Sequence, residues 1–199
     1  MEVSADVDPG TCMAPRLPSL LAAILAALLT ATTLCAGTAL ADQVSVRDAD
    51  DVDGRLDLAK VSHSHTGHVV EHTIKMQAGW RARVLEPGTL TVLFKSGSRY
   101  RTLWVDYRRH RLRARICTTE AAGGGATGRC TTDVGLTRPD GRSLQVSLRR
   151  GQVRKPGRAG YKWQVTTFLE GGEGECPRTR LCVDELPGAD PWIRHGFGG

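Results

Sequence analysis

The sequence predicts an all-β protein, an antiparallel β-sandwich of jelly-roll-like connectivity, and three observations lead to this prediction. Short segments rich in branched and aromatic residues recur along the chain, and Gly, Pro, Asp and Ser separate them. Several of these segments alternate apolar with polar residues, which is typical of strands with one buried face. The chain beyond residue 41 contains no long segment of helical periodicity. An immunoglobulin-like sandwich is the alternative arrangement of such strands.

The clearest strand pattern covers residues 90–117, where three strands follow one another: Thr91–Phe94, Tyr100–Arg108 and Arg111–Cys117. The third strand alternates strictly, so that Leu112, Ala114 and Ile116 share one face and the neighbouring arginines share the other. We therefore expect the apolar face to contact the core and the arginine face to contact solvent.

Further strands are expected on both sides of this pattern: Leu56–Ser64, Val69–Met76, Thr131–Leu136, Ser143–Leu148 and Tyr161–Leu169, with a short edge strand within 42–47 and a helical turn within 149–160. These segments place the β-sandwich domain at residues 42–185. Residues 186–199 contain prolines and several glycines, so we expect an irregular C-terminal tail there.

Residues 1–41 indicate a signal peptide with a signal helix. Arg16 precedes the apolar run Leu17–Leu29, and Ala39-Leu40-Ala41 matches the small-x-small cleavage pattern. A retained membrane helix is the alternative, but threonines interrupt the run and make it short for a bilayer span. Cleavage predicts a secreted, extracellular protein without a membrane span. It changes the formal charge from +6 to about +8, because one base and three acids leave with the leader.

Four cysteines remain after this cleavage, namely Cys117, Cys130, Cys176 and Cys182. An even number of cysteines in an exported chain indicates disulfides. Three pairings are open, and proximity in the sequence favours Cys117–Cys130 and Cys176–Cys182. Zinc is a poor alternative because the chain has no CxxC pair.

Arginines form the strongest surface signal. A basic face is predicted on the two strands that follow residue 98, and its candidate binding residues are Arg101, Arg109, Arg111, Arg113 and Arg115. Guanidinium groups form paired hydrogen bonds with phosphate, sulfate and carboxylate, so the expected ligand is an anionic polymer rather than a specific nucleic acid sequence. The alternative is a solvated strand face that discourages edge pairing.

Two clusters are candidate metal ligands. The acidic turn offers Asp48, Asp50, Asp51 and Asp53, followed by Asp57, but Val52 occupies the third ligand place of a DxDxDG loop. Asp184, Glu185 and Asp190 would complete a calcium site if the two ends of the domain meet. We expect no cofactor, with structural calcium as the alternative to a solvated turn.

Histidines form the second cluster, at the first predicted hairpin. His63 and His65 share a strand face, and His72 lies on the returning strand. Neutral imidazoles so placed suit zinc or copper, and a proton-sensing role is a further alternative. The simplest interpretation is an exposed hairpin end with ordinary histidines.

The order of motifs resembles that of a known group of proteins. The acidic turn is followed by Gly54-Arg55-Leu56-Asp57-Leu58. Much later comes Val146-Ser147-Leu148-Arg149-Arg150. A basic break follows it, and after the break comes Gly160-Tyr161-Lys162-Trp163-Gln164-Val165. This resembles uncharacterised secreted bacterial β-sandwich proteins and, more distantly, family 9 carbohydrate-binding and DOMON-type modules. The resemblance implies a sandwich and a glycan ligand. It assigns no sugar-binding residue, because Trp80, Trp104 and Trp163 each fit a core position.

No catalytic motif stands out, since the chain has neither a GxSxG elbow nor an HExxH sequence. We therefore predict a secreted non-catalytic module that binds an extracellular or cell-wall polymer. The expected polymer is either an anionic polymer or a cell-wall glycan. The alternatives are a secreted enzyme with an unrecognised hydrolytic site, or a structural domain that docks on an acidic protein. The sequence leaves the oligomeric state open.

Overall fold

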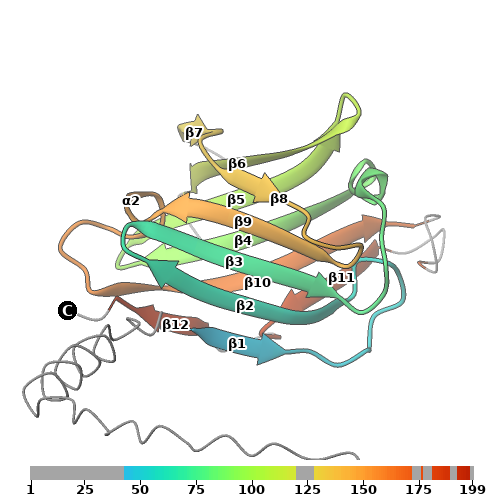
Figure 1. The fold of residues 1–199 in the computed structure, drawn as a ribbon, viewed down its shortest axis with the longest axis horizontal. Helices are drawn as coiled ribbons and strands as arrows, with labels where there is room; N and C mark the ends of the chain where they lie inside the picture. The colour runs from blue at the N-terminus through green and yellow to red at the C-terminus, as the bar shows by residue number, and fades with distance from the viewer. Residues whose placement is uncertain (1–42, 120–127, 172–175, 177–180, 189–191, 198–199) are drawn as a thin grey trace, which may run out of the picture. The chain divides into compact units, whose positions relative to one another are not determined.

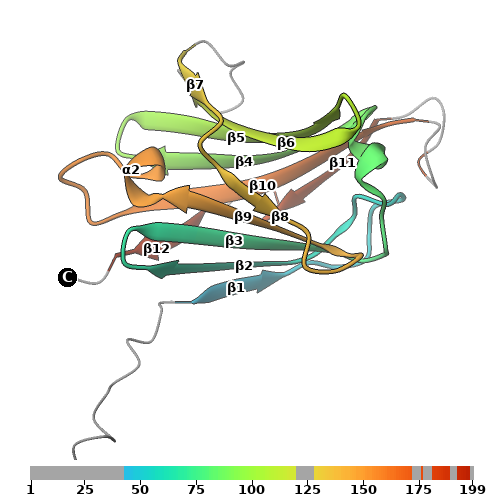
Figure 2. The same ribbon diagram turned by 45° about the horizontal axis from the view of Figure 1, so that its top comes forward.

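Two antiparallel sheets pack face to face in the computed structural model, as Figures 1 and 2 show. The structure describes residues 43–119, 128–171, 176, 181–188 and 192–197. The predicted signal peptide and most of the glycine-rich segment at 120–128 lie outside the described residues. The prediction of an all-β antiparallel sandwich is confirmed.

The smaller sheet has five strands, in the order β1 (Val44–Arg47), β2 (Leu58–Thr66), β3 (Val69–Met76), β9 (Ser143–Arg149) and β8 (Gly135–Thr137). The larger sheet has seven, of which six run in the order β11 (Leu181–Leu186), β10 (Gly160–Glu170), β4 (Gly88–Ser96), β5 (Arg99–Arg108), β6 (Arg111–Thr119) and β7 (Cys130–Thr131). The seventh strand, β12 (Ile193–Gly196), pairs with the first residues of β10, on the edge that β11 extends. Two short helices, η1 (Ala82–Leu85) and α2 (Arg150–Val153), lie in connections.

The core lies between the sheets because each long strand contributes every second side chain to it. In β10, Trp163 and Val165 are fully buried, and in β4 Phe94 is almost so. The predicted alternation of β6 is also confirmed: Ile116 is fully buried, while Leu112 and Ala114 pack against the core.

The C-terminal tail was wrongly predicted to be irregular. Residues Ile193–Gly196 form β12 despite the flanking prolines and glycines. His195 pairs with Tyr161 in the register, and both His195 and Phe197 are buried. The backbone pairing and the buried rings together keep this short segment extended.

Both predicted disulfides are present. Cys117–Cys130 joins β6 to β7, and Cys176–Cys182 joins the chain after β10 to β11. Among the described residues, no helix is long and apolar enough to cross a membrane.

Candidate anion-binding site

The connection from β3 to β4 crosses between the sheets and contains Trp80. The indole of Trp80 is 4% exposed, and its Nε1 donates a hydrogen bond to the carbonyl oxygen of Arg142 at 3.1 Å. The backbone N–H of Trp80 donates to the carbonyl oxygen of Gly141 at 3.0 Å. Trp80 thus fastens the connection to the turn before β9, and it serves as a wall rather than as an exposed platform.

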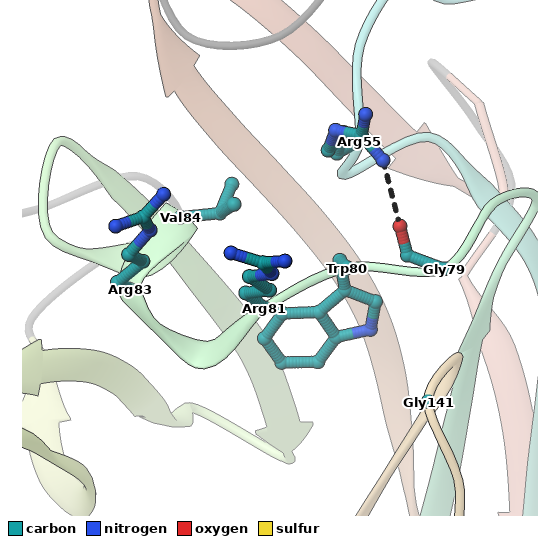
Figure 3. A pocket seen from close by; sticks show the side chains of 7 residues that line it. All are labelled: Arg55, Gly79, Trp80, Arg81, Arg83, Val84 and Gly141. Carbon is teal, nitrogen blue, oxygen red and sulfur yellow. Dashed lines mark hydrogen bonds between the residues drawn. The ribbon is translucent and has the colours of Figure 1, made fainter.

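A hollow of about 520 Å³ opens beside Trp80. Its lining includes the arginines Arg55, Arg81 and Arg83, which come from the loop before β2 and from the η1 region. Figure 3 shows the three guanidinium groups around the hollow, that of Arg55 donating a hydrogen bond to the carbonyl oxygen of Gly79 at 3.1 Å. The side chains of all three are exposed and accessible to a ligand.

Positive charge in this hollow is not compensated. The ion pairs found in the described part of the chain join Arg108 and Arg115 to Asp106, and Arg149 to Asp133, so none involves the three lining arginines. Behind the hollow, the guanidinium of Arg138 lies 4.1 Å from the centre of the Trp80 ring and adds to the positive potential. Such convergent guanidinium groups bind phosphate, sulfate or carboxylate groups through paired hydrogen bonds.

The sequence predicted the basic face elsewhere, and its five residues do not share one face. Arg111, Arg113 and Arg115 occupy the outer side of β6, away from the core residues that alternate with them. Arg109 is exposed at the β5–β6 turn, in a left-handed conformation with φ of 52°. Arg101 does not lie on this outer side, because it has the same parity as the buried Leu103 in β5.

A second hollow, of about 390 Å³, lies on this outer side next to η1. Trp104 and Asp106 of β5 line it, together with Arg108, Arg109 and Arg115. Asp106 accepts contacts from Arg108 at 3.4 Å and from Arg115 at 3.7 Å, which neutralises part of the charge. η1 contributes residues to both hollows, so two arginine-lined depressions flank one helix.

The aspartates of the acidic turn lie together, and two residues from elsewhere join them. Asp51 comes close to Asp57, which directly precedes β2, and to Asp184 of β11. Burial raises the pKa of Asp57 to about 8, with contributions from Asp50 and Asp184. Burial likewise raises the pKa of Asp48 to about 6, and the charge of Asp184 adds to this shift. Asp53 lines a hollow beside this group.

The histidines are not an exposed hairpin end. His63 and His72 are fully buried between the sheets, and His195 is 2% exposed. The rings of His63 and His195 lie 3.9 Å apart, and the hydroxyl of Tyr161 lies 3.2 Å from His63. His65, which is half-buried, has its Nδ1 3.0 Å from Nε2 of His195. No histidine belongs to the carboxylate group described above, so the two predicted metal clusters are separate.

Sequence reasoning missed the arginines of the Trp80 hollow because Arg55 lies more than twenty residues before Arg81 and Arg83, and none of the three belongs to a strand. The sequence feature that could have indicated this site is Trp80-Arg81-Ala82-Arg83, in which an aromatic residue stands next to two arginines. Trp192 was also missed; its ring lies 6.4 Å from that of Tyr100, beside the ammonium group of Lys95.

Comparisons with protein-family models, with curated proteins and with solved structures found no match.

Proposed function

We propose that this protein is an exported, non-catalytic binding module that holds an anionic polymer of the cell surface in the hollow beside Trp80. The observation that carries the proposal is the convergence of Arg55, Arg81 and Arg83 around one hollow without a carboxylate partner in the described part of the chain. The two disulfides support an oxidising compartment as the place of action.

The lining of the hollow favours an anionic group over a neutral sugar ring. Neutral sugars stack on exposed aromatic faces, but the Trp80 indole is buried beneath the arginines. Guanidinium groups are obligate donors with a permanent charge, so they match the acceptor oxygens of phosphate, sulfate or carboxylate. The charged groups of the ligand would therefore contribute more binding energy than its sugar rings.

The pair of hollows favours a polymer over a single small anion. The second hollow adjoins η1 through Leu85, and its three arginines, Arg108, Arg109 and Arg115, outnumber its two acids, Glu86 and Asp106. A chain that carries an anionic group on successive units would contact both depressions. Two such contacts on one flexible chain raise the overall affinity above that of either contact alone.

Binding of the full chain to wall teichoic acid, polygalacturonate and neutral dextran, measured by calorimetry at low and physiological salt, tests this proposal. We expect binding to the two polyanions, weakening as salt is raised, and none to dextran. Arg83→Glu should weaken polyanion binding at least tenfold. Arg47→Glu changes the charge equally at an exposed position in the edge strand β1 and serves as the control.

Equal affinities of the Arg83→Glu and Arg47→Glu proteins would show that net charge, rather than the hollow, determines binding, and would overturn the proposal. Stronger binding to dextran than to either polyanion would do the same and would direct attention to Tyr100 and Trp192. Loss of binding in Arg111→Glu alone would place the site on the outer face of β6.

A further inference from the structure

Three carboxylates from separate parts of the chain meet at one end of the sandwich. One oxygen atom each from Asp51, Asp57 and Asp184 lies within 4.8 Å of the other two. Asp51 belongs to the loop after β1 and is exposed, whereas Asp57 and Asp184 are 2% and 5% exposed. The group therefore has a buried base and an open side.

The buried base contains a carboxylate oxygen without a donor. Within the described part of the chain, Oδ1 of Asp57 is buried and accepts no hydrogen bond. Buried polar atoms are nearly always satisfied, so such an oxygen in a native fold indicates a missing partner. Asp51 and Asp57 both line the adjoining hollow, which offers space for such a partner.

The backbone holds the carboxylates in place despite their mutual repulsion. The N–H of Leu58 donates a hydrogen bond to Oδ2 of Asp184 at 2.5 Å, which joins β2 to β11 across the two sheets. The N–H of Gln77 donates to the carbonyl oxygen of Asp57 at 2.8 Å. No ion pair among the described residues brings a lysine or arginine to this group. A cation is therefore the component that would balance the charge.

We propose that Asp51, Asp57 and Asp184 bind a calcium ion. An all-oxygen set of carboxylates selects a hard cation, whereas zinc and copper prefer nitrogen or sulfur ligands. Calcium accepts irregular sets of six to eight oxygens, and the loop carbonyls and water molecules in the adjoining hollow of about 280 Å³ would supply the rest. Magnesium demands near-ideal octahedral geometry, and three carboxylates from separate parts of the chain do not by themselves impose it.

The ion would link the two sheets. Its ligands belong to the β1–β2 region of the smaller sheet and to β11 of the larger sheet. Calcium would therefore stabilise the folded protein and hold the acidic loop, independently of any polymer bound beside Trp80.

Calorimetric titration of the chelator-treated full chain with calcium chloride, together with thermal unfolding, tests this inference. We expect a single site with a Kd at or below about 10⁻³ M, the range of extracellular calcium modules. At 5 mM calcium the Tm should rise by about 5 °C, and magnesium at the same concentration should give a much smaller shift. A Tm unchanged by calcium, or raised equally by magnesium, would overturn the assignment.

Variants separate a calcium site from a crowded group of acids. Asp51→Asn changes an exposed residue, so the protein should fold and bind calcium at least tenfold more weakly. Asp57→Asn should leave the chelated protein at least as stable as the parent, because it removes the cost of burying a carboxyl group beside Asp50 and Asp184, yet abolish the calcium-dependent rise in Tm. Asp133→Asn removes one negative charge at an exposed position between β7 and β8, outside the carboxylate group, so it is the control and should keep the full calcium response.

Retention of the calcium response in both Asp51→Asn and Asp57→Asn would refute the site. These measurements are independent of the proposed polymer, since the arginines beside Trp80 should tolerate substitution without any change in calcium affinity.

Discussion

Nδ1 of His63 and Nε2 of His72 lie 3.1 Å apart in the interior of the sandwich, opposite each other in the register of β2 and β3. Burial lowers the pKa of His72 to about 3 and holds the pKa of His63 well below its ordinary value. The titratable groups of the described chain that face this pair are His65, Tyr161 and His195. The core therefore accommodates these imidazoles in their neutral form.

This arrangement predicts loss of stability in mild acid. Below about pH 6.5 the unfolded chain takes up protons that the folded His63 and His72 do not, so the free energy of unfolding falls as the pH falls. Each buried histidine contributes a slope of about 1.4 kcal/mol per pH unit. Urea unfolding between pH 7 and 4.5 should show a shallower slope for His72→Gln than for the parent.

Two comparisons isolate the histidine effect. Asp48 and Asp57 have raised pKa values, so they make the free energy of unfolding rise as the pH falls, which opposes the histidine effect. Both residues are present in the parent and in the variant, so their contribution cancels in the comparison. His68→Gln alters an exposed histidine in the β2–β3 turn and should keep the parent slope. Parallel slopes for the parent and His72→Gln would contradict the neutral, buried state.

Strand alternation in β6 predicts very different effects of two substitutions on the opposite faces of the strand. Ile116 is fully buried opposite Leu103, so Ile116→Asp places a charge in the core and should cost more than about 4 kcal/mol. Arg111 is exposed, and Arg111→Glu should change the free energy of unfolding by less than about 0.5 kcal/mol. Denaturant midpoints measure both, and similar losses in the two proteins would contradict the register.

The disulfides should contribute unequally to stability. Cys117 and Cys130 are 13 residues apart, whereas Cys176 and Cys182 are 6 apart, and a longer loop restricts the unfolded chain more. Replacing the first pair by alanine should cost about 3 kcal/mol, and replacing the second pair slightly more than about 2 kcal/mol. Mass mapping should first verify the pairing, and unfolding of the two double variants then measures the two losses of stability. A larger loss for the shorter loop would contradict the prediction.

Phe197, which follows β12, should contribute strongly to the stability of the fold. Its ring is 4% exposed, and the guanidinium of Arg150 lies 3.8 Å from its centre. Phe197→Ala should cost about 3 kcal/mol or more, as is usual for a buried aromatic residue. Arg194→Ala, in the exposed part of β12, is the matched control for thermal unfolding. Equal stability of both variants would mean that the buried ring of Phe197 does not stabilise the fold.

Much of the fold was predictable because its longest strands alternate. In β10 the alternation is unbroken, and Trp163 is buried as that period requires; in β6 it holds as far as Ile116, after which Cys117 is buried as well. The same alternation rule, applied to β2 and β5, would have corrected two expectations. His63 shares its face with buried Val61, and Arg101 has the parity of Leu103, so neither should have been expected on the surface.

The sites were less predictable because distant segments build them. Asp57 and Asp184 meet only through the pairing of β11 with β10 and the packing of the sheets, and no local pattern encodes that contact. The strand β12 has four residues between prolines and glycines, so its propensity favours a loop. Tertiary pairing with β10 overrides this local preference.

The position of β10 has a consequence for the order in which the chain can fold. On one side β3 pairs with β9 and β4 pairs with β10, and both partners are made much later; on the other side the neighbours are β2 and β5, which adjoin them in the sequence. A chain growing from its N-terminus, or passing through a membrane in that direction, therefore presents β3 and β4 with open edges until residue 170 has emerged. During this interval the hairpins β2–β3 and β4–β5 expose unpaired backbone groups along β3 and β4, and aggregates grow from such open strand edges. A protein built in this way depends on rapid completion of its synthesis or on a chaperone that shields unpaired strands.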